Sequence, residues 1–242
     1  MARAAINRRK SRVGMVLAIG LLAGARAQTI AFNRSEEFTP SRPSPRILLM
    51  PADIELSELS AAGIAFPKAE WTKAAIDHVA MAIDGFMGSR NATLVAYEAP
   101  PESSPEAYRQ GQIIKLHGAV GNAVLAHKFG PAQSLPTVRD RFDYTLGEGV
   151  RVLVGDGGAA DYALFVYIRD SYASSERAAV MMIGLFLGVA VPGGLQVGFA
   201  SLVDLGSGDI VWFNRLVNPA GDLRTRDSAQ KTVENLLADF PL

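Results

Sequence analysis

The sequence contains no cysteine and only three histidines among its 242 residues. Without cysteine, the chain cannot form a disulfide, a thiolate metal site or a thiol nucleophile, and it has no lipobox cysteine to carry a lipid anchor. The histidines show no short ligand spacing, which argues against a zinc site, and no cofactor is expected. Hydrophobic residues make up 49% of the chain. Stability must therefore come from a packed core, for which this share is sufficient.

The chain also lacks an excess of charge of either sign, with 24 basic and 24 acidic residues. A protein that binds nucleic acid non-specifically needs a basic face to neutralise phosphates, so no nucleic-acid partner is expected. The sequence contains no G-x-S-x-G, H-E-x-x-H or P-loop pattern. His78, His117 and His127 are each better explained as a hydrogen-bonded or exposed side chain than as a catalytic group.

Residues 1–27 have the pattern of a cleavable secretory signal peptide. Arg8, Arg9 and Lys10 lie in a basic stretch, which precedes an apolar run at 13–23 and the small-residue site Ala25-Arg26-Ala27. The apolar run is shorter than the ~20 residues that a membrane-spanning helix needs. We expect cleavage after Ala27 and a periplasmic or otherwise exported protein that begins at Gln28. The alternative is an uncleaved anchor.

The remaining chain is predicted to form a flexible linker at 28–45 and a single α/β domain at 46–242. Pro40, Pro43 and Pro45 disfavour regular structure in the linker. Residues 52–67 are expected to be irregular. Strands are predicted at 46–50, 92–98, 160–168, 197–205 and 210–217, and helices at 68–86, 105–128, 145–157 and 227–240. Capping boxes are predicted at Ser103-x-x-Glu106 and Thr145-x-x-Glu148.

This order of elements predicts an α/β (α+β) fold. It consists of a mixed sheet of about five strands with helices packed on it, a late antiparallel hairpin and a C-terminal helix. The run 162–168 is apolar on both faces and is predicted to be the central strand. Gly206-Ser-Gly-Asp209 is typical of the turn in the hairpin.

Two segments carry a resemblance to a known group of proteins. They are Asp161-Tyr-Ala-Leu-Phe-Val-Tyr-Ile-Arg-Asp170 and Gly198-Phe-Ala-Ser-Leu-Val-Asp-Leu-Gly-Ser-Gly-Asp-Ile-Val-Trp212. Together with the order of elements, they resemble uncharacterised exported proteins and lipoproteins of proteobacteria whose domain is similar to the N-terminal domain of TolB and to CsgG. The resemblance covers roughly residues 46 to 240. It implies an envelope role without catalysis and transfers no catalytic residue, and the missing lipobox cysteine departs from the lipoprotein members.

No charged side chain occurs from Ala178 to Val203. The leading interpretation is a buried helix or strand packed on the sheet. The second is an exposed apolar surface for oligomer or membrane-interface contact, with Met181, Leu185, Phe186 and Leu187 as the candidate residues. A membrane span is the third interpretation, although Pro192-Gly193-Gly194 divides the stretch into pieces too short to span.

The polar cluster with the most functional potential lies at strand ends and comprises Arg169, Asp170, Asp222 and Arg224. Sites in α/β sheets tend to form at strand ends. The simpler interpretation is a set of solvated loop charges and helix caps.

Two functional hypotheses follow from these observations. In the first, the chain is an exported periplasmic or cell-envelope protein with a non-catalytic binding or assembly role. Its partner would be an envelope protein or a second copy, and peripheral membrane contact stays open. In the second, it is an exported hydrolase with an unrecognised carboxylate site. That alternative requires Asp170 and Asp222 to meet in one pocket with shifted ionisation.

Overall fold

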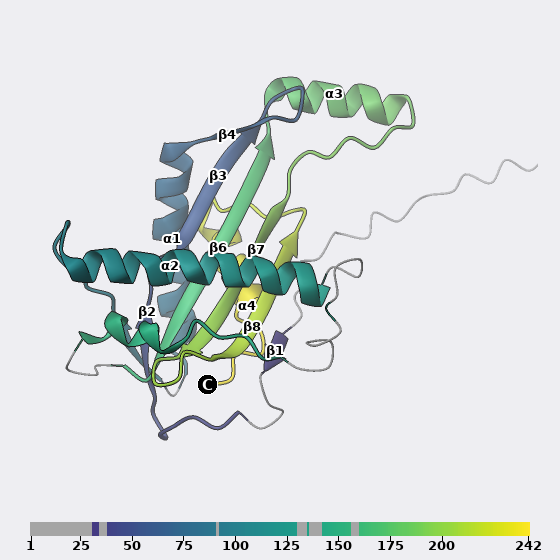
Figure 1. Ribbon diagram of the computed structural model, residues 1–242. Coiled ribbons are helices and arrows are strands. Elements are labelled where there is room, and N and C mark those ends of the chain that lie inside the picture. Colours follow the sequence, from purple (N-terminus) through teal and green to yellow (C-terminus); the bar gives the residue numbers. More distant parts are fainter. Residues whose placement is uncertain (1–30, 34–37, 91, 130–134, 136–141, 156–159) are drawn as a thin grey trace, which may run out of the picture.

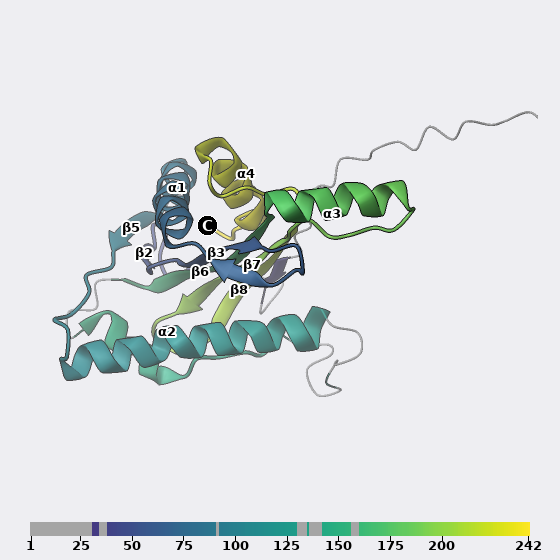
Figure 2. The same cartoon turned by 90° about the horizontal axis from the view of Figure 1, so that it is seen from above.

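A mixed sheet of eight strands forms the centre of the molecule, with helices on both faces (Figures 1 and 2). The computed structural model describes residues 31–33, 38–90, 92–129, 135, 142–155 and 160–242. The predicted signal peptide and the mature N-terminus at Gln28 lie outside these residues. The predicted α/β class is confirmed, with more strands than the five expected.

The element bounds show where the prediction holds. The strands are β1 (Ala31–Asn33), β2 (Arg46–Leu49), β3 (Asp53–Leu59), β4 (Ala65–Pro67), β5 (Thr93–Ala96), β6 (Tyr162–Ala173), β7 (Gln196–Asp204) and β8 (Ile210–Asn218). The helices are α1 (Ala69–Met87), α2 (Pro105–Val124), α3 (Ser175–Phe186) and α4 (Arg226–Leu236), with a π-helical turn at Leu125–Phe129 and a 3₁₀ helix at Glu148–Leu153. The five predicted strands and the late hairpin are all present.

The long strand β6 organises the sheet, whose main order is β1-β8-β7-β6-β2-β5. One edge of β6 pairs in parallel first with β2, at Ile47↔Tyr162, and then with β3, at Asp53↔Tyr167. Its other edge pairs antiparallel with β7 along nine residues. Pro51 lies between β2 and β3, and proline cannot donate to a ladder, so the break between these strands falls where the sequence permits it.

Each face of the sheet has its own hydrophobic core. Strand residues alternate between the faces. Leu164, Val166 and Ile168 pack in the core beneath α1 and α4, whereas Ala163 and Phe165 pack in the core beneath α2. Helix α1 buries Ala75, Val79, Ile83 and Met87, which lie four apart on one stripe. The predicted helical periodicity therefore identifies the buried face.

Both predicted capping boxes are wrong in detail. Helix α2 is capped by Ser104, whose Oγ accepts a hydrogen bond from the Ala107 amide, and Ser103 instead has a positive φ of 68°. The N-cap position of the 3₁₀ helix is occupied by Gly147 and not by Thr145. Thr145 lies two residues earlier, and its Oγ1 accepts a hydrogen bond from the Gly147 amide. The predicted end of this helix at Gly157-Gly158 lies outside the described residues. Because neighbouring polar residues compete to cap the same helix, spacing alone does not select the register.

Two segments predicted to lack regular structure contain strands. Residues 52–67 hold β3 and β4, so the expectation of an irregular segment is wrong. Within the predicted linker, β1 pairs with β8. Ser41 donates its amide to the Tyr162 hydroxyl at 3.0 Å, and Arg42 forms an ion pair with Asp161 at 2.7 Å. Strand β1 is therefore held by β8, and Ser41 and Arg42 are held by the first residue of β6 and the residue before it. The flexible-linker prediction is corrected for these residues.

Helix α3 departs from this layered body. It begins directly after β6 and extends away from the sheet, and residues 187–195 return alongside it to β7 (Figures 1 and 2). We call residues 175–195 the α3 arm.

Candidate functional site

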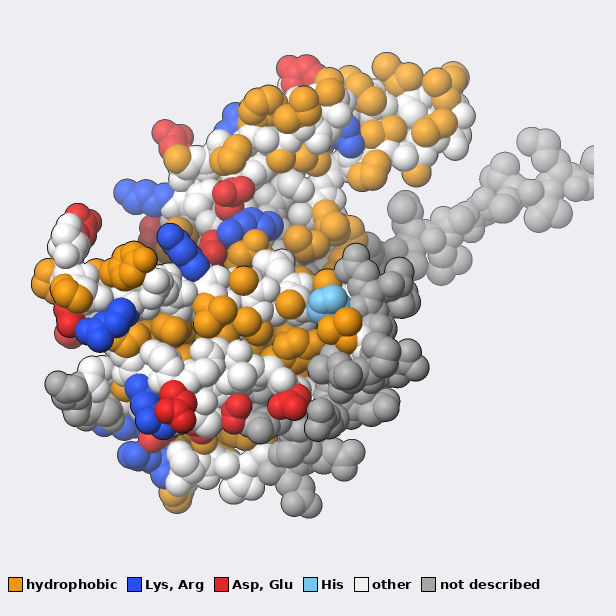
Figure 3. Space-filling model, in the orientation of Figure 1, with side chains coloured by type: hydrophobic (Ala, Val, Ile, Leu, Met, Phe, Trp, Pro, Cys, Tyr) orange, Lys and Arg blue, Asp and Glu red, His pale blue; other side chains and the backbone are white. Residues whose placement is uncertain are grey.

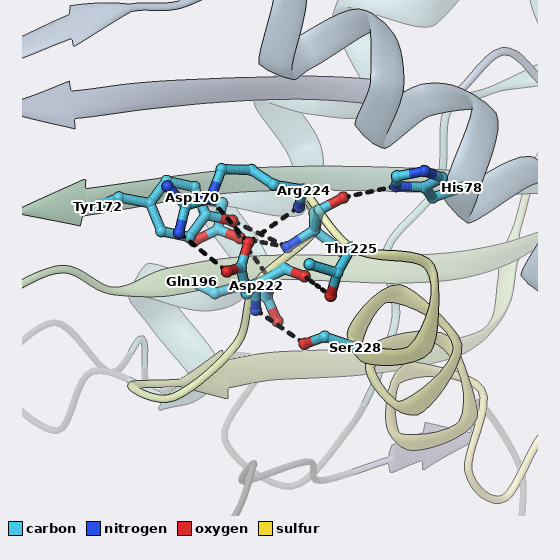
Figure 4. A network of polar contacts seen from close by, with 9 residues as sticks. His78, Asp170, Tyr172, Gln196, Asp222, Arg224, Thr225 and Ser228 are labelled. Carbon is cyan, nitrogen blue, oxygen red and sulfur yellow. Dashed lines mark hydrogen bonds and ion pairs between the residues drawn. The ribbon is translucent and has the colours of Figure 1, made fainter.

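Asp170, Asp222 and Arg224 come together near the C-terminal end of β6 (Figure 4). Asp170 lies on β6, and the other two lie in the loop that joins β8 to α4. Arg224 donates two hydrogen bonds to the Asp222 carboxylate, each 2.9 Å long. Its guanidinium stacks over the Tyr172 ring at 3.8 Å. Three of the four predicted strand-end residues thus form one network.

Arg169 lies apart from this network. Successive strand residues point to opposite faces of a sheet, so the neighbour of Asp170 faces the other side. There Arg169 pairs with Asp53 at 2.8 Å, and its guanidinium lies 4.0 Å from the Tyr167 ring centroid. The four predicted residues therefore do not make one cluster.

Tyr172 and Gln196 complete the network and were missed in the sequence. The Tyr172 hydroxyl donates to Asp170 Oδ2 and accepts from the Leu223 amide at 2.9 Å. Gln196 donates to the same Asp170 oxygen at 2.8 Å. Tyr172 could have been predicted from the sequence, because it lies two residues after Asp170 on the same strand and therefore on the same face of the sheet. Gln196 is opposite Asp170 in the antiparallel register, which depends on the fold.

The two carboxylates of the network have opposite pKa shifts. Burial raises the pKa of Asp170, and the hydrogen bonds from Tyr172, Gln196 and Leu223 oppose this effect only in part. The hydrogen bonds from Arg224 lower the pKa of Asp222. Burial also raises the pKa of the Tyr172 hydroxyl. Asp170 is 3% exposed, and its Oδ1 has no hydrogen-bond partner among the described residues.

Asp170 lines a pocket of about 470 Å³ at the base of the α3 arm, together with Met181, Gly193, Gln196 and Asn218. It also borders a second pocket of about 340 Å³ near Arg169. Asp222 is not among the residues that line either pocket. Neither of these two pockets therefore brings the two carboxylates together. The evident effect of the network is to tie the β8–α4 loop to the sheet through Leu223.

Hydrophobic side chains gather on the surface of the α3 arm (Figure 3). Phe186 is 92% exposed, Leu185 72% and Leu187 69%. Met181 is partly buried and lines the pocket at the base of the arm. The leading interpretation, that this stretch packs in the core, is wrong for these residues. The apolar pattern was visible in the sequence, but the sequence did not show that no described element covers these side chains.

Local contacts determine how the arm is built. The Ser174 side chain caps α3 by accepting from the Arg177 amide. Gly184 faces the returning segment, where a Cβ would come within 3 Å of the Val191 side chain and the Val189 carbonyl. Gly194 passes so close to the Ser171 backbone that a Cβ would overlap it. These glycines let the chain turn back against the helix and re-enter the sheet.

The described part of the chain gives no membrane-spanning helix, because none of its helices is both long and apolar enough to cross a bilayer. Over the same residues, no group of three or more histidine, aspartate or glutamate side chains is placed to hold a metal ion. The buried His117 bonds the Ser201 hydroxyl at 2.6 Å, and His78 bonds the Leu223 carbonyl at 3.0 Å. Both agree with the prediction of hydrogen-bonded histidines.

Neither a scan against protein-family models nor a search of curated proteins finds a match. Among solved structures, the chain is similar to PelC from Paraburkholderia phytofirmans, described as a dodecamer, and to a single-residue variant of it in another crystal form. In both cases the identity is 9% and the TM-score 0.36, over 88% of this chain and 96% of PelC. This similarity is too low to transfer function or assembly.

Proposed function

We propose that this chain is an exported cell-envelope protein that acts by binding rather than catalysis, with the α3 arm as its contact surface. The single observation that carries the binding role is the exposure of the apolar arm. Soluble domains rarely leave contiguous apolar patches uncovered, and such patches commonly mark interaction sites. The signal-peptide pattern and the resemblance to exported proteobacterial proteins with TolB-like and CsgG-like domains support the envelope location.

The hydrolase alternative receives no comparable support. It requires Asp170 and Asp222 to act on one substrate from one pocket. Asp222 is instead occupied by two hydrogen bonds from Arg224, and it borders neither pocket that Asp170 lines. The opposite pKa shifts of the pair follow from burial and from this ion pair, which are structural causes.

Export is tested by producing the full-length chain in a Gram-negative host and fractionating the cells. The expected product is an envelope protein whose N-terminus, read by mass spectrometry, is Gln28. An intact Met1 in the mature pool would refute cleavage.

The contact surface is tested with a photo-crosslinking amino acid at position 186. Position 108 is the matched control, because Tyr108 is also an aromatic residue on a helix and is 70% exposed. We expect adducts from position 186 and none from position 108 in intact cells. Equal yields from both positions, or none from either, would contradict the arm as the contact surface.

Substitutions should separate contact from folding. Leu185→Lys and Leu187→Lys place a charge at positions that are already exposed, so the free energy of unfolding should change by less than about 0.5 kcal/mol. Crosslinking from position 186 should fall in both variants. A large loss of stability in either would show that the arm is covered by its own chain.

A further inference from the structure

The apolar tip of the α3 arm, which we define as residues 182–187, is exposed over most of its circumference. At 3.6 residues per turn, the exposed positions 182, 183, 185, 186 and 187 span an arc of about 200°. The remaining arc contains Gly184, which faces the returning segment, and Met181 lies just before it. The tip therefore offers apolar side chains in nearly every direction that its own chain leaves open.

This distribution differs from that of a helix that docks on one protein surface. Such a helix carries an apolar stripe about 100° wide with polar residues beside it. No polar side chain interrupts the tip, and no charged side chain occurs from residue 178 to residue 203. A partner has to surround the tip, and a fluid apolar phase does so without a shaped socket. We infer that the occupant of the apolar tip is the hydrocarbon–headgroup boundary of a lipid bilayer.

The position of charge along the arm agrees with shallow insertion. The nearest charged residues, Glu176 and Arg177, lie in the first turn of α3. Arg177 is held there by hydrogen bonds to the Pro192 carbonyl at 2.8 and 3.0 Å. The charge-free helix beyond it, residues 178–186, is about 14 Å long, against the ~5–10 Å to which interfacial helices bury their apolar faces. The tip can leave water without desolvating a charge.

A second apolar feature lies at the same end of the molecule. The turn between β3 and β4 adjoins the base of the arm, where Arg177 donates to the Ala61 carbonyl at 3.3 Å (Figure 1). This hairpin exposes Ile64 and Phe66, which are 59% and 53% exposed. Two neighbouring elements therefore direct uncovered apolar side chains to one end of the sheet, as contact with an extended surface requires.

The backbone limits the depth of insertion. Residues 189–195 have no regular secondary structure, and unpaired backbone groups are not tolerated in the hydrocarbon core. The geometry thus fits a helix tip that rests in the interface and does not cross the bilayer. This inference rests on the proposed role of the α3 arm as a contact surface, and it names the partner of that surface.

The test is vesicle flotation with protein made from the full-length chain. Its N-terminus is read first, because an uncleaved apolar run at 13–23 would bind lipid by itself. Wild-type protein should float with vesicles of phosphatidylcholine, and adding phosphatidylglycerol or salt should change little, since the tip carries no charge. Phe186→Asp should weaken binding at least about tenfold. Tyr108 lies on α2, which covers the face of the sheet opposite α1 and α4 and is not part of the α3 arm. Tyr108→Asp should therefore leave vesicle binding unchanged.

A tryptophan at the tip reports insertion directly and does not depend on a charged variant folding. With vesicles, the emission of Phe186→Trp should shift to the blue and be quenched by brominated lipid, whereas that of Tyr108→Trp should do neither. Trp71 and Trp212, measured in the parent chain, provide the background.

Three outcomes would overturn the lipid inference. One is a folded wild-type protein that does not float, with Phe186→Trp unshifted. Another is flotation that Phe186→Asp leaves intact, because lipid would then bind elsewhere. The third is a wild-type oligomer that Phe186→Asp dissociates without any vesicle binding, which would assign the tip to a second copy and leave the proposed binding role of the arm standing.

Discussion

His117 should make the fold sensitive to mild acid. Its imidazole is 3% exposed on α2, bonds Ser201 and stacks on Phe165 with ring centroids 4.3 Å apart. Burial lowers the pKa of this side chain from 6.5 to about 3. In the unfolded chain the same side chain titrates near its ordinary value, so protonation favours unfolding over the interval between the two pKa values.

The effect of pH on the free energy of unfolding follows from the linkage between protonation and folding. Because the folded pKa is depressed, the contribution of His117 to stability is fully present above pH 6.5 and is lost as the pH falls toward about 3. Each pKa unit is worth about 1.4 kcal/mol, so lowering the pH from 7 to 5 should remove about 2 kcal/mol from the free energy of unfolding. That is a large part of the ~5–15 kcal/mol that stabilises a typical domain.

The assay is urea unfolding of the wild type and of His117→Gln across pH 5 to 7. Glutamine retains a group that can bond Ser201, but it does not titrate. The variant loses the stack on Phe165 at every pH, which displaces its stability curve without changing the slope. We expect the wild-type curve to fall more steeply by about 2 kcal/mol over this range. Parallel curves would refute the burial of a neutral imidazole.

Three further predictions concern the core. Gly121→Ala in α2 should destabilise the protein by about 1–3 kcal/mol, because its Cβ would overlap the Phe199 ring. Gly111→Ala is the control, since it faces open space on the same helix and should stabilise the protein by about 0.5–1 kcal/mol. Equal shifts in melting temperature would contradict this prediction. Phe165→Asp should abolish soluble expression, since an unpaired carboxylate would enter the central strand, and wild-type yield would show that β6 is misplaced. Burial raises the pKa of Asp170 above its ordinary value of 3.8. The free energy of unfolding of the wild type should therefore decline relative to that of Asp170→Asn as the pH rises above 3.8. A difference between the two proteins that does not change with pH would contradict the raised pKa.

Local periodicity determined much of this fold from the sequence alone. The apolar run at 162–168 identified the central strand, and the helical pattern at 68–86 identified α1. The short turn at 206–209 indicated the β7–β8 hairpin. Each of these signals lies within a few residues of the structure that it specifies, because the periods of helix and strand are properties of the local backbone.

The tertiary structure decided the features that depend on distant partners. Strand β3 pairs with the C-terminal half of β6, which is more than 100 residues away along the chain. Gln196 meets Asp170 only through the register of β6 and β7. The exposure of the α3 arm, which carries the proposed function, also depends on tertiary structure. An apolar helix has the same sequence pattern whether another element covers it or not, so the exposure of Phe186 follows only from where the rest of the chain packs.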